Sequence, residues 1–147
     1  MEHPFRDWLL AGLAGTAALG RFEWLERLAL GREPAYAPAA ISGRLFGTRR
    51  YGPLLRWIYG PALGVAYGAL AARSAGRSAR WRPARPLSFG LAVAAAELIG
   101  LPWIGATPRL RGREVAALVV HACAFSLATD AALDQAERSA SRSASAV

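Results

Sequence analysis

The sequence predicts an all-α fold, an integral membrane four-helix bundle whose helices pack through glycine and alanine. Hydrophobic residues make up 54% of the 147 residues, and the mean hydropathy is +0.21 although 19% of the residues are charged. This combination is typical of apolar segments separated by charged loops. In the run at residues 56–72, small residues recur at every fourth position: Gly60, Gly64, Gly68 and Ala72. On a helix they form one stripe, a glycine zipper, against which another membrane helix can pack backbone to backbone.

Composition excludes several classes of protein. The net charge is +8, and all 18 basic residues are arginine. A nucleic-acid-binding protein could carry such a charge, but these arginines gather between the apolar segments. This distribution favours arginines that flank membrane spans beside anionic head groups, and no nucleic-acid partner is expected.

Cys123 is the only cysteine, which excludes an internal disulfide and a cysteine-based zinc site. The N-terminus lacks a basic region followed by a cleavage site, so no removable signal peptide is expected.

The first predicted helix covers about residues 7–30. Its uncharged first part is too short to cross about 30 Å of hydrocarbon at about 1.5 Å per residue, so the charged residues that follow belong to the same helix. Small residues at Gly12, Thr16 and Gly20 share one face of this helix, and that face leads to Glu23. A short soluble amphipathic helix is the alternative for this segment.

Three further helices are predicted at about residues 53–72, 87–106 and 114–134. The loop at residues 32–52 is rich in proline and glycine, and it leaves room for a short interfacial helix around residues 39–46.

Two arginine-rich loops, residues 73–86 and 107–113, join the later helices. Four spans place both ends of the chain on the same side of the membrane, and the two sides carry nearly equal numbers of arginines. The density of arginine in residues 73–86 favours a cytoplasmic N-terminus. We therefore expect one transmembrane domain over residues 1–136 and a disordered, Ser- and Arg-rich tail over residues 137–147.

Four ionisable side chains fall at similar depths in the predicted bundle. Helix rise places them in one half of the bilayer, within about 10 Å of depth: Glu23, Arg56, Glu97 and His121. Each lies on or beside the small-residue face of its helix. Since charged groups in a bilayer usually face the bundle interior, we predict a buried polar cluster. Within it, we expect Glu23 to pair with Arg56 and Glu97 to pair with His121.

The predicted cluster has two interpretations. In a structural interpretation, its pairs only hold the bundle together by hydrogen bonds. In a functional interpretation, a carboxylate and an imidazole exchange a proton in a proton-linked or ligand-binding site. The spacings of metal ligands such as HExxH are absent, as are the GxSxG, P-loop and GxGxxG motifs, so we predict no metal site, no cofactor and no enzyme. Pigment or haem binding through His121 is a third class, based only on the Ala-x-x-x-His spacing from Ala117.

Other polar residues have simpler interpretations. Trp57 and Tyr59 suit an interfacial aromatic belt at the start of the second helix. Asp130 and Asp134 lie near the opposite membrane face, where we expect pairing with Arg73 or Arg77.

Several short motifs carry a family resemblance. They are the run GLAGTAAL at Gly12–Leu19 with a following acidic residue, the run RWIYGPALGVAYG at Arg56–Gly68, Glu97 followed by Leu101-Pro102, and a histidine in the last helix. Over about residues 8–134, the chain resembles the YagU-like bacterial inner-membrane proteins and related small families. The resemblance implies a small multi-helix protein of the bacterial cytoplasmic (inner) membrane, and it supplies no catalytic residues.

The leading functional prediction is a multi-pass membrane protein without enzymatic activity, either an accessory subunit or part of an oligomer. Its expected partners are membrane lipids and either copies of itself or another membrane protein. The alternative is a small proton-linked transporter or channel that uses the cluster of Glu23, Arg56, Glu97 and His121.

Overall fold

The computed structural model describes four stretches of the chain: residues 4–30, 37–74, 84–105 and 112–145. These stretches are almost entirely helical and contain no β-strand, which confirms the all-α prediction for them. In chain order the elements are α1 (Pro4–Leu30), α2 (Ala37–Phe46), the short 3₁₀ helix η1 (Arg49–Tyr51), α3 (Gly52–Ser74), α4 (Ala84–Trp103) and α5 (Gly112–Ser145).

The long helices begin within a few residues of the predicted ones, and α2 covers the place left for a short interfacial helix. The predicted loops fall partly on residues 31–36, 75–83 and 106–111, which lie outside the described residues.

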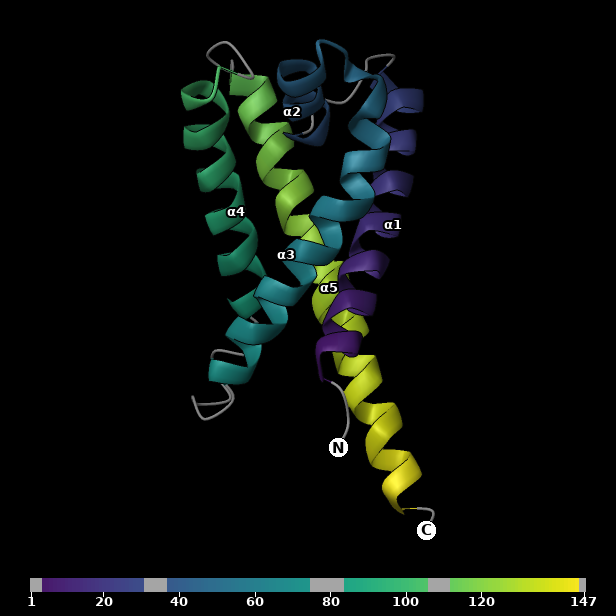
Figure 1. The fold of residues 1–147 in the computed structure, drawn as a ribbon. Helices are drawn as coiled ribbons and strands as arrows, with labels where there is room; N and C mark the ends of the chain where they lie inside the picture. The colour runs from purple at the N-terminus through teal and green to yellow at the C-terminus, as the bar shows by residue number, and fades with distance from the viewer. Residues whose placement is uncertain (1–3, 31–36, 75–83, 106–111, 146–147) are drawn as a thin grey trace.

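Helix α5 extends further than predicted, because residues 137–145 are helical and not a disordered tail. Alanine, glutamate and arginine in this stretch favour helix. The serine hydroxyls donate to carbonyl oxygens one turn earlier, as from Ser139 Oγ to Gln135 O at 2.9 Å and from Ser141 Oγ to Glu137 O at 2.9 Å. The last turns of α5 project beyond the ends of the other helices (Figure 1).

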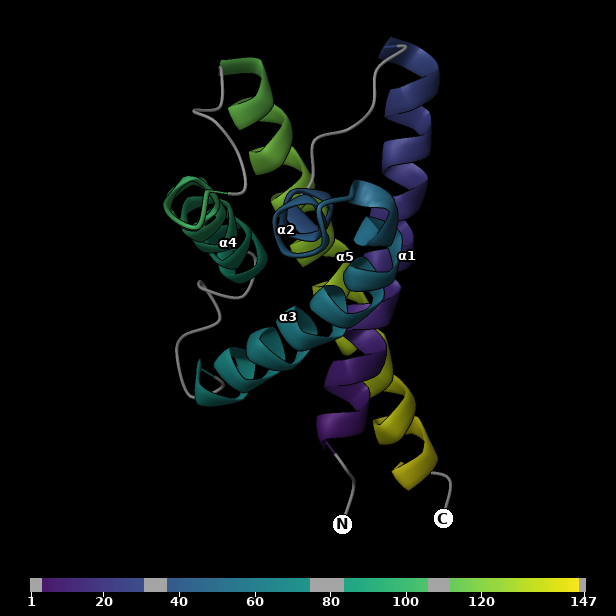
Figure 2. The ribbon, with the colours of Figure 1, turned by 45° about the horizontal axis from the view of Figure 1, so that its top comes forward.

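Helices α1, α3 and α5 form the centre of the bundle, and α4 packs against α5 (Figures 1 and 2). Helix α1 begins and α5 ends at the same end of the molecule, the bottom of Figure 1. The short α2 lies at the opposite end and contacts α3 and α4. A hydrogen bond links α2 to the end of α4, since Arg44 Nε donates to Ile104 O at 3.1 Å. Gly105, with φ 67°, follows directly in the left-handed conformation that commonly ends a helix.

Helices α1 and α3 approach each other through glycine. A Cβ atom built at Gly12 would lie 2.8 Å from the carbonyl oxygen of Gly60 and 2.9 Å from Cα of Gly64. Thr16 Oγ1 donates to Gly12 O at 2.8 Å, so its hydroxyl bonds to its own helix. Gly68, one turn after Gly64, lies against a tryptophan side chain of α1. The predicted packing residues of the two helices therefore meet in one interface.

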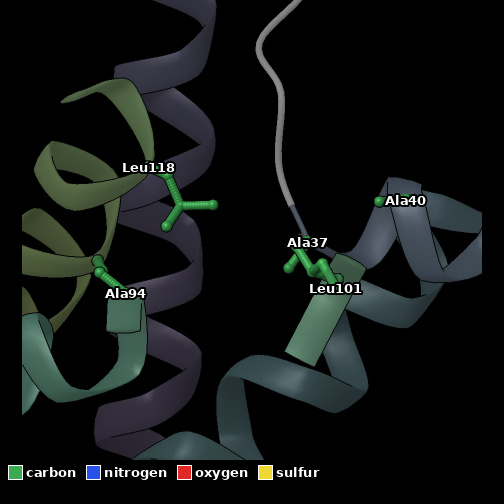
Figure 3. Close-up of a cluster of buried hydrophobic side chains, with 6 residues drawn as sticks. Ala37, Ala40, Ala94, Leu101 and Leu118 are labelled. Carbon is green, nitrogen blue, oxygen red and sulfur yellow. The ribbon is translucent and has the colours of Figure 1, made fainter. Parts of the chain in front are cut away.

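The buried core is built mainly from small side chains. One cluster joins α2, α4 and α5 and consists of Ala37, Ala40, Ala94, Leu101, Leu118 and Ala122 (Figure 3). A second cluster, at the other end of the bundle, joins α1, α3 and α5 through Ala11, Tyr67 and Leu133.

Large apolar side chains lie mostly on the outside of the bundle. Every α-helix exposes at least two of them, among them Trp24 on α1, Phe46 on α2, Trp57 on α3, Trp103 on α4 and Val120 on α5. The arrangement is the opposite of a soluble core, where the largest apolar side chains are the most buried.

Two helices are long and apolar enough to cross a membrane, α4 and residues 112–143 of α5. A core helix of a soluble protein can meet the same criterion, but such a helix is mostly buried. Here only 28% and 33% of the two apolar windows are buried. Among the described residues, α1 and α3 do not meet the criterion, so length and composition support two spans instead of the expected four. Charged residues in the second half of α1 and the many glycines of α3 account for their lower hydropathy.

Candidate functional site

A cavity of about 50 Å³ lies inside the bundle, and all five α-helices contribute to its wall. We call it the polar cavity, because ionisable side chains from three helices meet in an otherwise apolar lining. The lining residues are Thr16, Leu19, Pro38, Arg56, Tyr59, Gly60, Leu63, Val93, Glu97, Leu118, His121, Ala122 and Phe125.

Glu23 and Arg56 form a buried ion pair between α1 and α3, as the sequence predicted. Arg56 Nη2 donates to Glu23 Oε2, and the two side chains are only 16% and 7% exposed. Gly20 lies beside this pair, since a Cβ atom built there would be 3.4 Å from Nη1 of Arg56. Burying either charge alone would be costly, so the pairing is what permits both residues inside the bundle.

Glu97 accepts a hydrogen bond from Tyr59, and not from His121 as the sequence analysis expected. Tyr59 Oη donates to Glu97 Oε1 at 2.8 Å and so joins α3 to α4. Tyr59 lies three residues after Arg56, so the two side chains share one face of α3 and both line the cavity. The aromatic-belt interpretation of Tyr59 was therefore wrong. Its spacing from Arg56 was the signal that could have identified it.

His121 is only 6% exposed and lines the polar cavity from α5. Its ring packs edge-on against Phe22 of α1, with ring centroids 5.4 Å apart at an interplanar angle of 88°. Thus Arg56, Glu97 and His121 share one cavity wall, and Glu23 lies behind Arg56 as its counter-ion.

A second cluster of polar side chains links α3, α4 and α5 at the other end of the bundle. Tyr67 is fully buried, and its Oη donates to Asp130 Oδ1. Arg85 donates from Nε to Tyr67 Oη at 3.0 Å and from Nη2 to Asp130 Oδ1. Asp130 thus pairs with Arg85 of α4, and Asp134 pairs with Arg138 of its own helix, 3.4 Å away. The structure thus places Arg85 and Arg138, and not the expected Arg73, beside the two aspartates. Arg77, the other expected partner, lies outside the described residues.

The polar cavity suits small ligands and proton exchange better than metals or large cofactors. Among the described residues, no group of three or more His, Cys, Asp or Glu side chains is placed to hold a metal ion. A cavity of about 150 Å³ is known to hold benzene, and a cavity of about 50 Å³ is too small to enclose a porphyrin beside His121. Glu97 and His121 do, however, bring a carboxyl and an imidazole to one cavity, the kinds of side chain that form proton relays in membrane proteins.

Comparison of the chain with protein-family models, with curated proteins and with solved structures gives no match. The resemblance to the YagU-like proteins therefore stays a prediction.

Proposed function

We propose that the chain is a small, multi-pass integral membrane protein without enzymatic activity, which acts as a subunit of a membrane assembly. The observation that carries this proposal is the exposure of large apolar side chains on every α-helix. Exposed apolar surface of this extent is covered by lipid or by another protein in the native environment.

The burial of the two most apolar helices supports the same conclusion. Only about a third or less of the apolar windows of α4 and α5 is buried inside the rest of the chain, at 33% for α5 and 28% for α4. The chain itself supplies no further described element to cover them, so membrane lipids, a second copy or another membrane protein would have to do so. The bacterial inner membrane is the compartment that the resemblance implies.

Alkaline carbonate extraction tests the membrane assignment. We expect the chain to stay in the membrane pellet and Leu91→Arg, at an exposed apolar position of α4, to reduce insertion, because arginine at a span centre costs about 2.5–3.5 kcal/mol. Ser143→Arg, on the projecting end of α5, is the matched control and should insert normally. A chain that is released by carbonate and stays monomeric in buffer would contradict the proposal.

Co-purification after cross-linking in native membranes tests the subunit role. The proposal expects a defined complex, either a homo-oligomer or a complex with another membrane protein. Recovery of the cross-linked chain only as a monomer would oppose it.

A proton-linked transporter or channel is the second candidate function, and the polar cavity favours it. The cavity brings Tyr59, Glu97 and His121 together inside the bundle, where ionisable residues commonly mark proton or ion pathways. Proton flux into proteoliposomes is the test. Glu97→Gln should abolish the flux if this function is correct, whereas a purely structural subunit has no flux to lose.

A further inference from the structure

We infer that the polar cavity binds one small monovalent cation with N–H donors, of the size of ammonium or methylammonium, at the carboxylate of Glu97. The inference rests on the second candidate function and names the class of substrate that the cavity would take.

The charge balance of the cavity favours a cation. Glu23 and Arg56 neutralise each other as an ion pair. Glu97 adds a further carboxylate, held by a neutral hydroxyl from Tyr59. When ionised, Glu23, Arg56 and Glu97 together carry a net formal charge of −1. A buried carboxylate needs a compensating charge or a proton, because an isolated ion is expensive to remove from water.

The hydrogen-bonding capacity of Glu97 favours a donor-rich ligand. Tyr59 Oη occupies one oxygen of Glu97, and a carboxylate has about four acceptor positions. The hydroxyl oxygen of Tyr59 is itself an acceptor. An ammonium ion, which carries only donors, complements both groups, whereas an anion would meet the carboxylate of Glu97 and an Arg56 that Glu23 already engages.

The size and walls of the cavity restrict the ligand further. A volume of about 50 Å³ exceeds the space of one water molecule and is about a third of a cavity known to hold benzene. Apolar side chains form most of the wall, including Leu63, Val93 and Leu118. The side chain of Phe125 also lines the cavity. A cation with one or two non-hydrogen atoms meets these limits.

Binding of methylammonium chloride to the full chain in lipid nanodiscs tests the inference, with saturation-transfer NMR and isothermal titration as readouts. We expect saturable binding with one site per chain and at least a tenfold loss of affinity in Glu97→Gln. That substitution keeps the shape of the side chain and an acceptor for Tyr59. Glu137→Gln, at an exposed position of α5, is the matched control and should bind as the unmodified chain does.

Small ligands of other charge test whether binding requires a positive charge. Acetate, an anion, and acetonitrile, which is neutral, should not compete with methylammonium. Unchanged binding in Glu97→Gln, competition by acetate, or no saturable binding by the folded chain would each overturn the inference. Proton flux that persists without methylammonium binding would overturn the ligand class and leave the transport function intact. Absence of any flux with methylammonium bound at Glu97 would overturn transport alone.

The pH dependence gives a second check. Glu97 faces Tyr59 and Arg56 from α3 and His121 from α5, with Glu23 of α1 behind Arg56. A proton on Glu97 competes with the cation, because both need the same carboxylate oxygens. Affinity for methylammonium should therefore fall as the pH falls, by up to tenfold per pH unit. The same affinity throughout the titration would contradict binding at Glu97.

Discussion

Tyr59 and Glu97 meet inside the bundle, where water competes little for their hydrogen bond. Tyr59→Phe removes the donor while keeping the ring, and it should destabilise the chain by about 1–3 kcal/mol, because a partly buried carboxyl loses its partner. Glu97→Gln should cost less, since the amide oxygen accepts the same hydrogen bond. Reversible unfolding by SDS in bicelles measures both changes.

The control for this prediction is another tyrosine. Tyr51 is 48% exposed in η1, and Tyr51→Phe should leave stability unchanged. Equal losses in the two Tyr→Phe variants would mean that the hydrogen bond to Glu97 contributes nothing specific.

The Glu23–Arg56 ion pair should show strong energetic coupling, because both side chains are largely buried. A double-mutant cycle with Glu23→Gln and Arg56→Gln should give a coupling free energy of about 0.5–3 kcal/mol. The exposed pair of Asp134 and Arg138, on successive turns of α5, is the reference and should give about 0.3–0.5 kcal/mol. Coupling no larger than that of the reference pair would refute the stabilising role of the buried one.

At the scale of the helix, the close contact between α1 and α3 depends on missing side chains. Gly64→Leu should separate the two helices, because even a Cβ atom at Gly64 would overlap the backbone of Gly12. We expect a lower midpoint of thermal unfolding and weaker Glu23–Arg56 pairing. Cysteine cross-linking between α1 and α3 would show that the two helices have moved apart.

Gly100 provides the control, because it is a glycine in α4 with nothing within 4 Å of a built Cβ atom. Gly100→Ala should be neutral or stabilising by up to about 1 kcal/mol through helix propensity. If Gly64→Leu proved as harmless as Gly100→Ala, the glycine stripe would not be a packing surface.

The helices were predictable because glycine, proline and charge runs mark their ends in the chain. Helix α5 was the exception, since its serine- and arginine-rich end lacks an apolar face and resembles a disordered segment. Its serines instead bond to their own helix, as Ser139 does to Gln135. The pairing of Glu23 with Arg56 could be predicted from their depths in the bilayer and from the helix faces on which they lie. The partner of Glu97 could not be predicted in this way. The choice between Tyr59 and His121 depends on the tilt between helices, which a single sequence does not encode locally.

At the scale of the whole molecule, most interior positions hold small side chains, and most large apolar side chains face outward. Ala94 is 1% exposed in the cluster of α2, α4 and α5, and Ala94→Leu should destabilise the bundle by about 1–3 kcal/mol through overpacking. Ile99, on the same helix, is 73% exposed, and Ile99→Ala should change stability by less than about 0.5 kcal/mol in the lipid-embedded chain. Unfolding in bicelles compares the two. A larger loss for Ile99→Ala would show that another protein covers this face.

The interior of small residues also determines how the sequence can drift over evolution. Positions such as Gly12, Gly64 and Ala94 accept little beyond what they already hold, because any added atom meets backbone or a filled core. Outward positions accept any apolar residue that lipid tolerates. Divergent descendants of this chain should therefore share the spacing of their smallest residues long after their leucines and tryptophans have been exchanged. A search for homologous sequences would then succeed best when it weights matches at glycine and alanine positions most heavily.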